Sequence, residues 1–140
     1  MILPVLLNTS IFILLSFMHI YWALGGKRGM NAVIPTITEN QDIIKPGPFI
    51  TLAIAAGMGL FAFVIIGNLD IFREYIDISF FKYATLVIGI LFTLRAIGDF
   101  RYVGFFKKAT GTTFAKNDTR YYSPLSVVIA FFCYLIVLLD

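Results

Sequence analysis

The chain has 140 residues, of which 59% are hydrophobic and only 14% are charged. Soluble globular domains carry about 25% charged residues, so this composition excludes a soluble globular domain. The net charge of +3 does not indicate nucleic-acid binding, because the basic residues follow the distribution seen in membrane proteins. The sequence therefore predicts an integral membrane protein that does not bind nucleic acid.

Four long apolar segments follow one another along the chain. About 20 residues of helix cross the ~30 Å of hydrocarbon in a bilayer, so we expect each segment to be a membrane-spanning helix. The predicted helices cover residues 2–24, 49–69, 80–98 and 122–139. The predicted fold is all-α: a single domain over residues 1–140, an integral membrane four-helix bundle with an amphipathic, aromatic cytoplasmic loop between the third and fourth helices.

The basic residues predict the orientation of this bundle. Loop two holds only Arg73 and Lys82, and the terminal tails hold no Lys or Arg. Because Lys and Arg concentrate in cytoplasmic loops, we expect loops one and three in the cytoplasm and both termini outside. Loops one and three together hold eight Lys and Arg: Lys27, Arg28, Lys45, Arg101, Lys107, Lys108, Lys116 and Arg120.

The second predicted helix contains small residues at a spacing of four. Ala53 and Gly57 form one such pair, and Ala55 and Gly59 form another. Small residues at this spacing allow helix backbones to approach closely in lipid. We therefore expect this helix to pack tightly in the bundle, and a homodimer or a membrane-protein partner docking on it is a further possibility. The only cysteine, Cys133, lies within the fourth apolar segment and is expected to pack there.

Loops one and three differ from plain connections. Residues 25–47 are apolar enough to pack on the bundle, and residues 100–108 alternate aromatic and basic side chains. The alternating segment predicts an interfacial aromatic belt, or else a segment that gates a cavity or binds anionic lipid head groups. The sequon Asn117-Asp118-Thr119 falls in a predicted cytoplasmic loop, so glycosylation is not expected. Ser123 and Pro124 are expected to cap and begin the fourth helix.

The candidate site lies near the cytoplasmic ends of the first and third helices. His19, the only histidine, lies about five residues before the end of the first helix. Arg95 and Asp99 lie at the end of the third helix, which runs in the same direction. Ionisable groups are costly in lipid and usually face a bundle interior or a wet cavity. The topology therefore predicts that these three residues share one depth.

Two interpretations of this cluster remain open. Arg95 and Asp99 can pair at i, i+4, although an acid at a helix C-terminus is disfavoured by the helix dipole. Either a buried ion pair locks the third helix to the first beside His19, or a polar pocket binds a ligand. The predicted ligand-binding residues are His19, Trp22, Arg95, Asp99 and Arg101. One His and one Asp are too few for a metal site, and no cofactor and no catalytic residue are predicted.

Three motifs carry a resemblance to a known family. They are His19-x-x-Trp22-Ala23-x-Gly25-Gly26, the segment from Arg95-x-x-Gly98-Asp99 to Lys107, and Tyr122-Ser123-Pro124-Leu125. The chain resembles small bacterial four-helix membrane proteins that form a domain of unknown function. The resemblance implies a multi-pass protein of the bacterial inner membrane and no established activity.

The sequence leaves three functional hypotheses. The first is a protein that binds or transports a small or lipid-like molecule through a pocket at His19, Arg95 and Asp99, with membrane lipid as a partner. The second is a structural or accessory membrane subunit in which the charged cluster is a helix–helix lock. The third is a membrane enzyme acting on a lipid-like substrate with His19 or Asp99 as acid or base, although one histidine and few carboxylates offer little catalytic apparatus.

Overall fold

The computed structural model describes residues 1–28, 36–38, 41–42, 47–98 and 117–140. The all-α prediction is confirmed: four helices are long and apolar enough to cross a membrane. They are α1 (Ile2–Ala23), α3 (Pro48–Gly67), α4 (Ile78–Ile97) and α6 (Ser123–Leu139), the last preceded by a π-helical turn, η1 (Asp118–Tyr122). In the first loop, β1 (Thr36–Thr38) pairs with β2 (Gln41–Asp42) in a short antiparallel ribbon that hydropathy did not predict.

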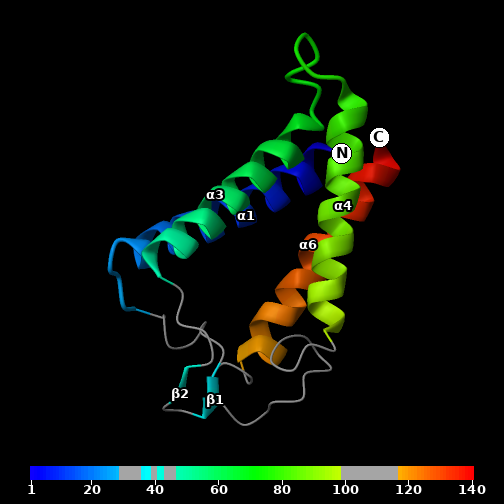
Figure 1. Ribbon diagram of the computed structural model, residues 1–140. Helices are drawn as coiled ribbons and strands as arrows, with labels where there is room; N and C mark the ends of the chain where they lie inside the picture. Colours follow the sequence, from blue (N-terminus) through cyan, green and yellow to red (C-terminus); the bar gives the residue numbers. More distant parts are fainter. Residues whose placement is uncertain (29–35, 39–40, 43–46, 99–116) are drawn as a thin grey trace.

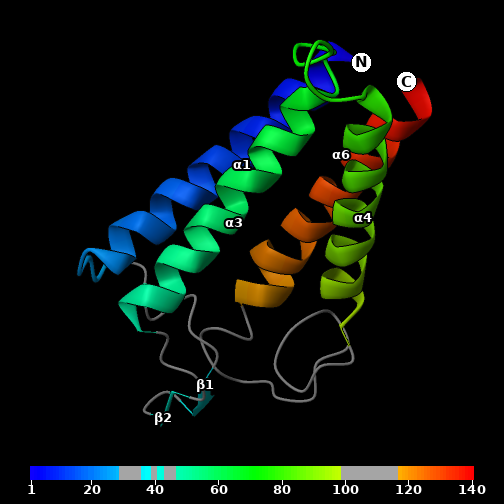
Figure 2. The ribbon, with the colours of Figure 1, turned by 45° about the horizontal axis from the view of Figure 1, so that its top comes forward.

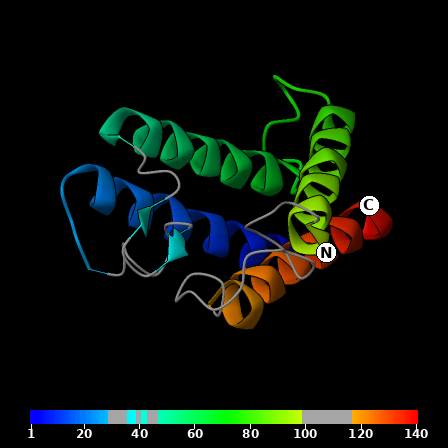
Figure 3. The same ribbon diagram turned by 60° about the horizontal axis from the view of Figure 1, so that its bottom comes forward.

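The helices form two antiparallel hairpins that meet at one end. α1 packs along α3 and α4 packs along α6, whereas the contacts between the hairpins are much sparser. Figures 1 and 2 show the hairpins close together near the two termini and spread apart toward the other end, where α1 and α4 finish and α3 and α6 begin. Figure 3 shows this spread from below. The bundle is therefore a wedge rather than a closed four-helix cylinder.

The core of buried apolar side chains lies where the hairpins meet, and two buried asparagines join them there. Asn8 in α1 points its side-chain amide at the Sγ of Cys133 in α6, 3.3 Å away. Asn68, which follows α3, donates to the Oγ1 of Thr85 in α4 over 2.7 Å. Inside a membrane a polar side chain is most stable when it bonds to a neighbouring helix, so these contacts fix the narrow end of the wedge.

Small residues allow α1 and α3 to approach closely, but at only one of the two predicted pairs. The Oγ of Ser16 donates to the carbonyl of Ala55 over 2.8 Å, and a Cβ on Gly59 would lie 3.8 Å from that same Oγ. A Cβ on Gly57 would meet nothing within 4 Å, and Ala53 is exposed. Ala55 is therefore buried against α1 and Gly59 lies at the edge of this contact, whereas Gly57 faces open space.

The helix boundaries differ slightly from the predicted ones, for local reasons. α4 begins at Ile78, two residues early, because the side chain of Asp77 accepts from the backbone N–H of Ser79 over 2.7 Å. The expectation that Ser123 caps the fourth helix is wrong: the helical backbone continues upstream through η1. Pro124 has no N–H and its ring clashes with the carbonyl four residues before it. The π-helical turn is wider than an α-helical turn and leaves room for the proline ring. Within it, the N–H of Ser123 bonds to the carbonyl of Asp118, five residues back.

Candidate functional site

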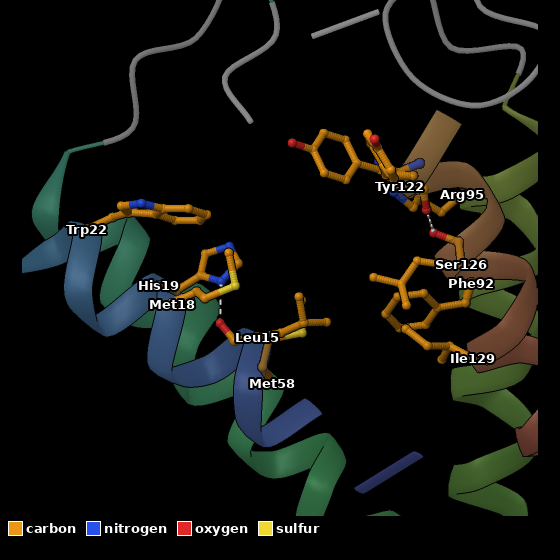
Figure 4. Close-up of a pocket in the computed structure, with 12 residues that line it drawn as sticks. Leu15, Met18, His19, Trp22, Met58, Phe92, Arg95, Tyr122, Ser126 and Ile129 are labelled. Carbon is orange, nitrogen blue, oxygen red and sulfur yellow. Dashed lines mark hydrogen bonds between the residues drawn. The ribbon is translucent and has the colours of Figure 1, made fainter. Parts of the chain in front are cut away.

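A cavity of about 370 Å³ lies in the wedge between the two hairpins. Figure 4 shows side chains from α1 facing side chains from α4 and α6 across it. Most of its polar residues lie toward the wide end of the wedge, with Ser126 one turn further in, and Phe92 and Ile129 lie deeper. The lining residues are Leu15, Met18, His19, Trp22, Met58, Phe92, Arg95, Tyr121, Tyr122, Leu125, Ser126 and Ile129.

The α1 wall presents an imidazole in a fixed tautomer. The Nδ1 of His19 lies 2.7 Å from the carbonyl of Leu15, which can only accept, so Nδ1 carries the proton. The Nε2 of the neutral ring is therefore a hydrogen-bond acceptor. His19 also packs edge-to-face on Trp22, with 5.2 Å between ring centroids. The indole N–H of Trp22 donates to the carbonyl of Arg28 over 2.9 Å, which fixes the indole ring in turn.

The opposite wall contains a buried ion pair. The Nη2 of Arg95 lies 2.8 Å from the Oδ1 of Asp118, whose side chain is 0% exposed. The hydroxyl of Ser123 donates to the other oxygen, Oδ2, over 3.1 Å. The π-helical turn places Asp118 and Ser123 on the same side of the helix, since it bonds residues five apart. The Nη1 of Arg95 is buried and has no hydrogen-bond partner, so the guanidinium keeps unused donor capacity.

Three phenylalanines lie at the deep end of the cavity. Phe92 lines it, and its ring contacts Phe12 edge-on at 5.4 Å between centroids and Phe61 at 6.3 Å. Phe12 and Phe61 are 5.5 Å apart. We call these three residues the aromatic plug. They come from α1, α3 and α4, so the plug closes the wedge between the cavity and the end that carries the termini.

The structure brings three of the predicted ligand-binding residues to one cavity: His19, Trp22 and Arg95. Asp99 and Arg101 lie outside the described residues, as does the aromatic segment of loop three. The binding role of all five stays a prediction. Among the described residues, Arg95 pairs with Asp118 in η1 and His19 bonds within its own helix. The predicted pairing of Arg95 with Asp99 lies outside the described residues and stays a prediction.

Sequence reasoning missed Asp118 and the two tyrosines of η1. Asp118 was interpreted only as the middle of a sequon, although an acid shortly before an apolar helix is favoured by the positive end of the helix dipole. Tyr121 lies just before the predicted fourth helix and Tyr122 is its first residue, so hydropathy marks neither of them as a site residue. Among the described residues, no group of three His, Cys, Asp or Glu side chains could hold a metal ion.

Four apolar helices in two hairpins, with a cavity between them, define a small multi-pass membrane protein. A family model matches residues 12–133, and the chain belongs to that family, which is described as Protein of unknown function (DUF3995). The matched range contains every residue that lines the cavity. No curated protein and no solved structure matches the chain.

Proposed function

We propose that this protein binds a small amphipathic molecule in the cavity between its two hairpins. The proposal rests on one observation: the side chains that line the cavity become more apolar with depth. His19, Arg95 and the tyrosines line the wide end of the wedge, and Phe92 and Ile129 line the deeper part. A ligand with a polar head and an apolar tail matches this gradient, with its head at the wide end and its tail against the aromatic plug.

The size of the cavity limits the ligand. Small-molecule sites are typically about 300–1,000 Å³, so about 370 Å³ is at the lower end of that range. A cavity of this size takes one short alkyl chain or one small ring system with its head group. It is too small to enclose a two-chain phospholipid. The proposed ligand is therefore a single-chain or small cyclic amphiphile that dissolves in the membrane.

Binding requires no change in the structure, whereas transport would require one. The aromatic plug lies between the cavity and the narrow end of the wedge, where the core residues of both hairpins pack together. A molecule crossing the membrane through this wedge would have to separate Phe92 from Phe12 and Phe61. We therefore propose ligand binding as the basic activity, with passage across the membrane as an additional step that depends on displacement of the plug.

A second candidate function is the structural one, and the Arg95–Asp118 pair favours it. The pair and the Ser123 hydroxyl tie the end of α4 to the start of α6. A helix lock is sufficient to explain why two charges are retained at this depth. The two functions are compatible, because the same lock would hold one wall of the cavity in place.

We propose the location and orientation from the charge distribution: a bacterial inner membrane, with loops one and three in the cytoplasm and both termini outside. The wide end of the wedge would then face the cytoplasm. A homodimer or a membrane-protein partner through α3 also stays a proposal. The face around Gly57, which has open space in front of it, is where such a partner would dock.

Native mass spectrometry of protein extracted gently from its membrane tests the binding proposal. We expect wild-type protein to retain a single-chain or small cyclic amphiphile. Met18 lines the cavity and is 45% exposed, so Met18→Trp should fill the cavity and reduce the bound fraction at least tenfold without disturbing the core. Phe17→Trp is the matched control, because Phe17 is its neighbour, is 65% exposed and does not line the cavity. Equal ligand occupancy in both variants would contradict the proposal.

A further inference from the structure

A second hollow lies on the α4–α6 hairpin, on the side turned away from the cavity. It is a groove of about 300 Å³ and shares no lining residue with the cavity. In α6, Phe131 of the groove follows Ile129 of the cavity by two residues, which is about 200° around the helix axis. The groove therefore belongs to a surface of the hairpin that the proposed function does not use.

The size of the side chains shapes this groove. Ala96 in α4 and Ala130 in α6 are buried and small, and they form its floor. Ile97, Val127 and Phe131 are about half exposed and form its rim. Two small residues between larger ones thus leave a furrow where the two helices run side by side.

The only polar side chains of the groove, Thr93 and Tyr134, are bonded to each other. The hydroxyl of Thr93 lies 2.8 Å from the carbonyl of Gly89 and 2.8 Å from the hydroxyl of Tyr134. Because a carbonyl can only accept, Thr93 donates to Gly89 and Tyr134 donates to Thr93. Both hydroxyl hydrogens are used within the hairpin, so the groove suits an occupant that needs no hydrogen-bond donor, such as a hydrocarbon chain.

The dimensions of the groove favour a thin occupant. Along α6 it extends from Val127 to Tyr134, which is about 10 Å at 1.5 Å per residue. One leaflet of the ~30 Å hydrocarbon layer is about 15 Å thick, so the groove covers about two thirds of one leaflet. Spread along this length, about 300 Å³ corresponds to a cross-section of about 30 Å². An α-helix is ~10 Å across with its side chains and does not fit into such a furrow.

We propose that this groove binds one acyl chain of a membrane phospholipid, in the leaflet at the wide end of the wedge. Between lipid and protein the hydrophobic effect gives no preference, so van der Waals packing decides which surfaces hold a lipid. A chain in the furrow contacts its floor and both rims, whereas a chain on a convex helix face is contacted from one side only. The proposal does not depend on the proposed function, because the cavity is elsewhere and is too small for a two-chain phospholipid.

Native mass spectrometry of protein extracted gently from its membrane tests this proposal. We expect wild-type protein to retain one phospholipid, which its mass distinguishes from a single-chain ligand of the cavity. Val127→Trp and Ile97→Trp each place an indole in the groove from an exposed rim position, one from α6 and one from α4. Each should lower the phospholipid-bound fraction about tenfold, which corresponds to ~1.4 kcal/mol of lost packing.

The matched control is Val128→Trp. Val128 is the neighbour of Val127, is 41% exposed against 47%, and lines neither the groove nor the cavity. This variant should retain the phospholipid, as should Met18→Trp, which fills the cavity. Thermal unfolding in detergent should give all four variants midpoints close to that of the wild type, because each replaces an exposed side chain.

Several results would overturn the proposal. They are a wild-type protein that retains no phospholipid, equal phospholipid occupancy in Val127→Trp and Val128→Trp, and loss of the phospholipid in Met18→Trp, which would place the lipid at the cavity. A dimer that dissociates in Val127→Trp but persists in Val128→Trp would assign the groove to a second copy of the chain. None of these results depends on whether the cavity holds its own single-chain ligand, so the two proposals fail separately.

Discussion

Arg95 and Asp118 are 23 residues apart in the sequence and their side chains meet at 2.8 Å, which closes the α4–α6 hairpin at the wide end of the wedge. Asp118 is fully buried, whereas the side chain of Arg95 is 31% exposed. The guanidinium therefore lies at the boundary between the hairpin and the cavity. Its Nη2 bonds within the hairpin, and the residue also lines the cavity.

This pair can be tested by a double-mutant cycle. Breaking a buried ion pair by removing one partner typically costs about 3–5 kcal/mol, and the partial exposure of Arg95 places our expectation near the lower figure. We expect Arg95→Leu and Asp118→Leu each to lower the unfolding free energy, measured by denaturation with sodium dodecyl sulfate. The double variant should recover much of the loss. Additive losses in the double variant would show that the two side chains do not depend on each other.

A second prediction concerns the close contact between Gly67 and Phe81. A Cβ added to Gly67 would overlap the Phe81 ring, which is buried and has little room to move. We expect Gly67→Ala to destabilise the protein by about 1–3 kcal/mol, the usual cost of overpacking. Gly57→Ala in the same helix is the control, because its Cβ would meet open space and alanine favours helix. Thermal unfolding in detergent measures both, and equal midpoints would contradict the prediction.

A third prediction uses the cap of α4, which lies outside the membrane-spanning segment. Hydrogen bonds from Ser79 hold the pKa of Asp77 below its ordinary value. The carboxylate therefore stabilises the folded state at neutral pH, above its unfolded pKa, and this contribution is lost as the pH falls through the folded pKa. We expect Asp77→Ala to lower the unfolding temperature at pH 7 and to have a progressively smaller effect as the pH falls through the folded pKa. A loss of unfolding temperature that is equal at pH 7 and at low pH would contradict the prediction.

A fourth prediction tests the orientation with single cysteines on a Cys133→Ala background. Arg28 in loop one and Arg73 in loop two are both exposed. With loop two outside, an impermeant thiol reagent added to intact cells should label Arg73→Cys and should not label Arg28→Cys until the membrane is opened. The reverse pattern would place the wide end of the wedge on the outer face. Labelling of both sites in intact cells would indicate insertion in two orientations.

The four helices were predictable because a bilayer sets a threshold for both length and hydropathy, and each segment meets it over nearly its whole length. The relative tilt of the hairpins was not predictable. Helices that are apolar on almost every side do not show in their sequence which face meets which neighbour. Asn8 and Asn68 lie at the contact between the two hairpins. Their sequence positions do not reveal this, because their partners Cys133 and Thr85 are identified only in the structure.

The candidate site was predictable in part. The order and direction of the predicted helices set the depth of each residue in the membrane. They placed His19 and Arg95 at the same end of the bundle. The partner of Arg95 did not follow, because spacing along one helix favours Asp99, whereas Asp118 reaches Arg95 through space from another element. The π-helical turn that positions Asp118 depends on how the backbone accommodates Pro124 at the start of a helix. A kink, a helix break or a wider turn can each do so, and the sequence does not show which one forms.

The π-helical turn also bears on how the length of this protein can vary during evolution. Each residue of an α-helix rotates the chain by about 100°, and the turn at Asp118–Tyr122 absorbs one residue more than a regular turn would. A deletion of one codon here would remove the wider turn, bring the Pro124 ring against the preceding helical turn and swing the Asp118 carboxylate about a quarter of the way around the helix axis. We therefore expect single-residue insertions and deletions in this turn to be rejected by selection more strictly than most substitutions of the lipid-facing side chains.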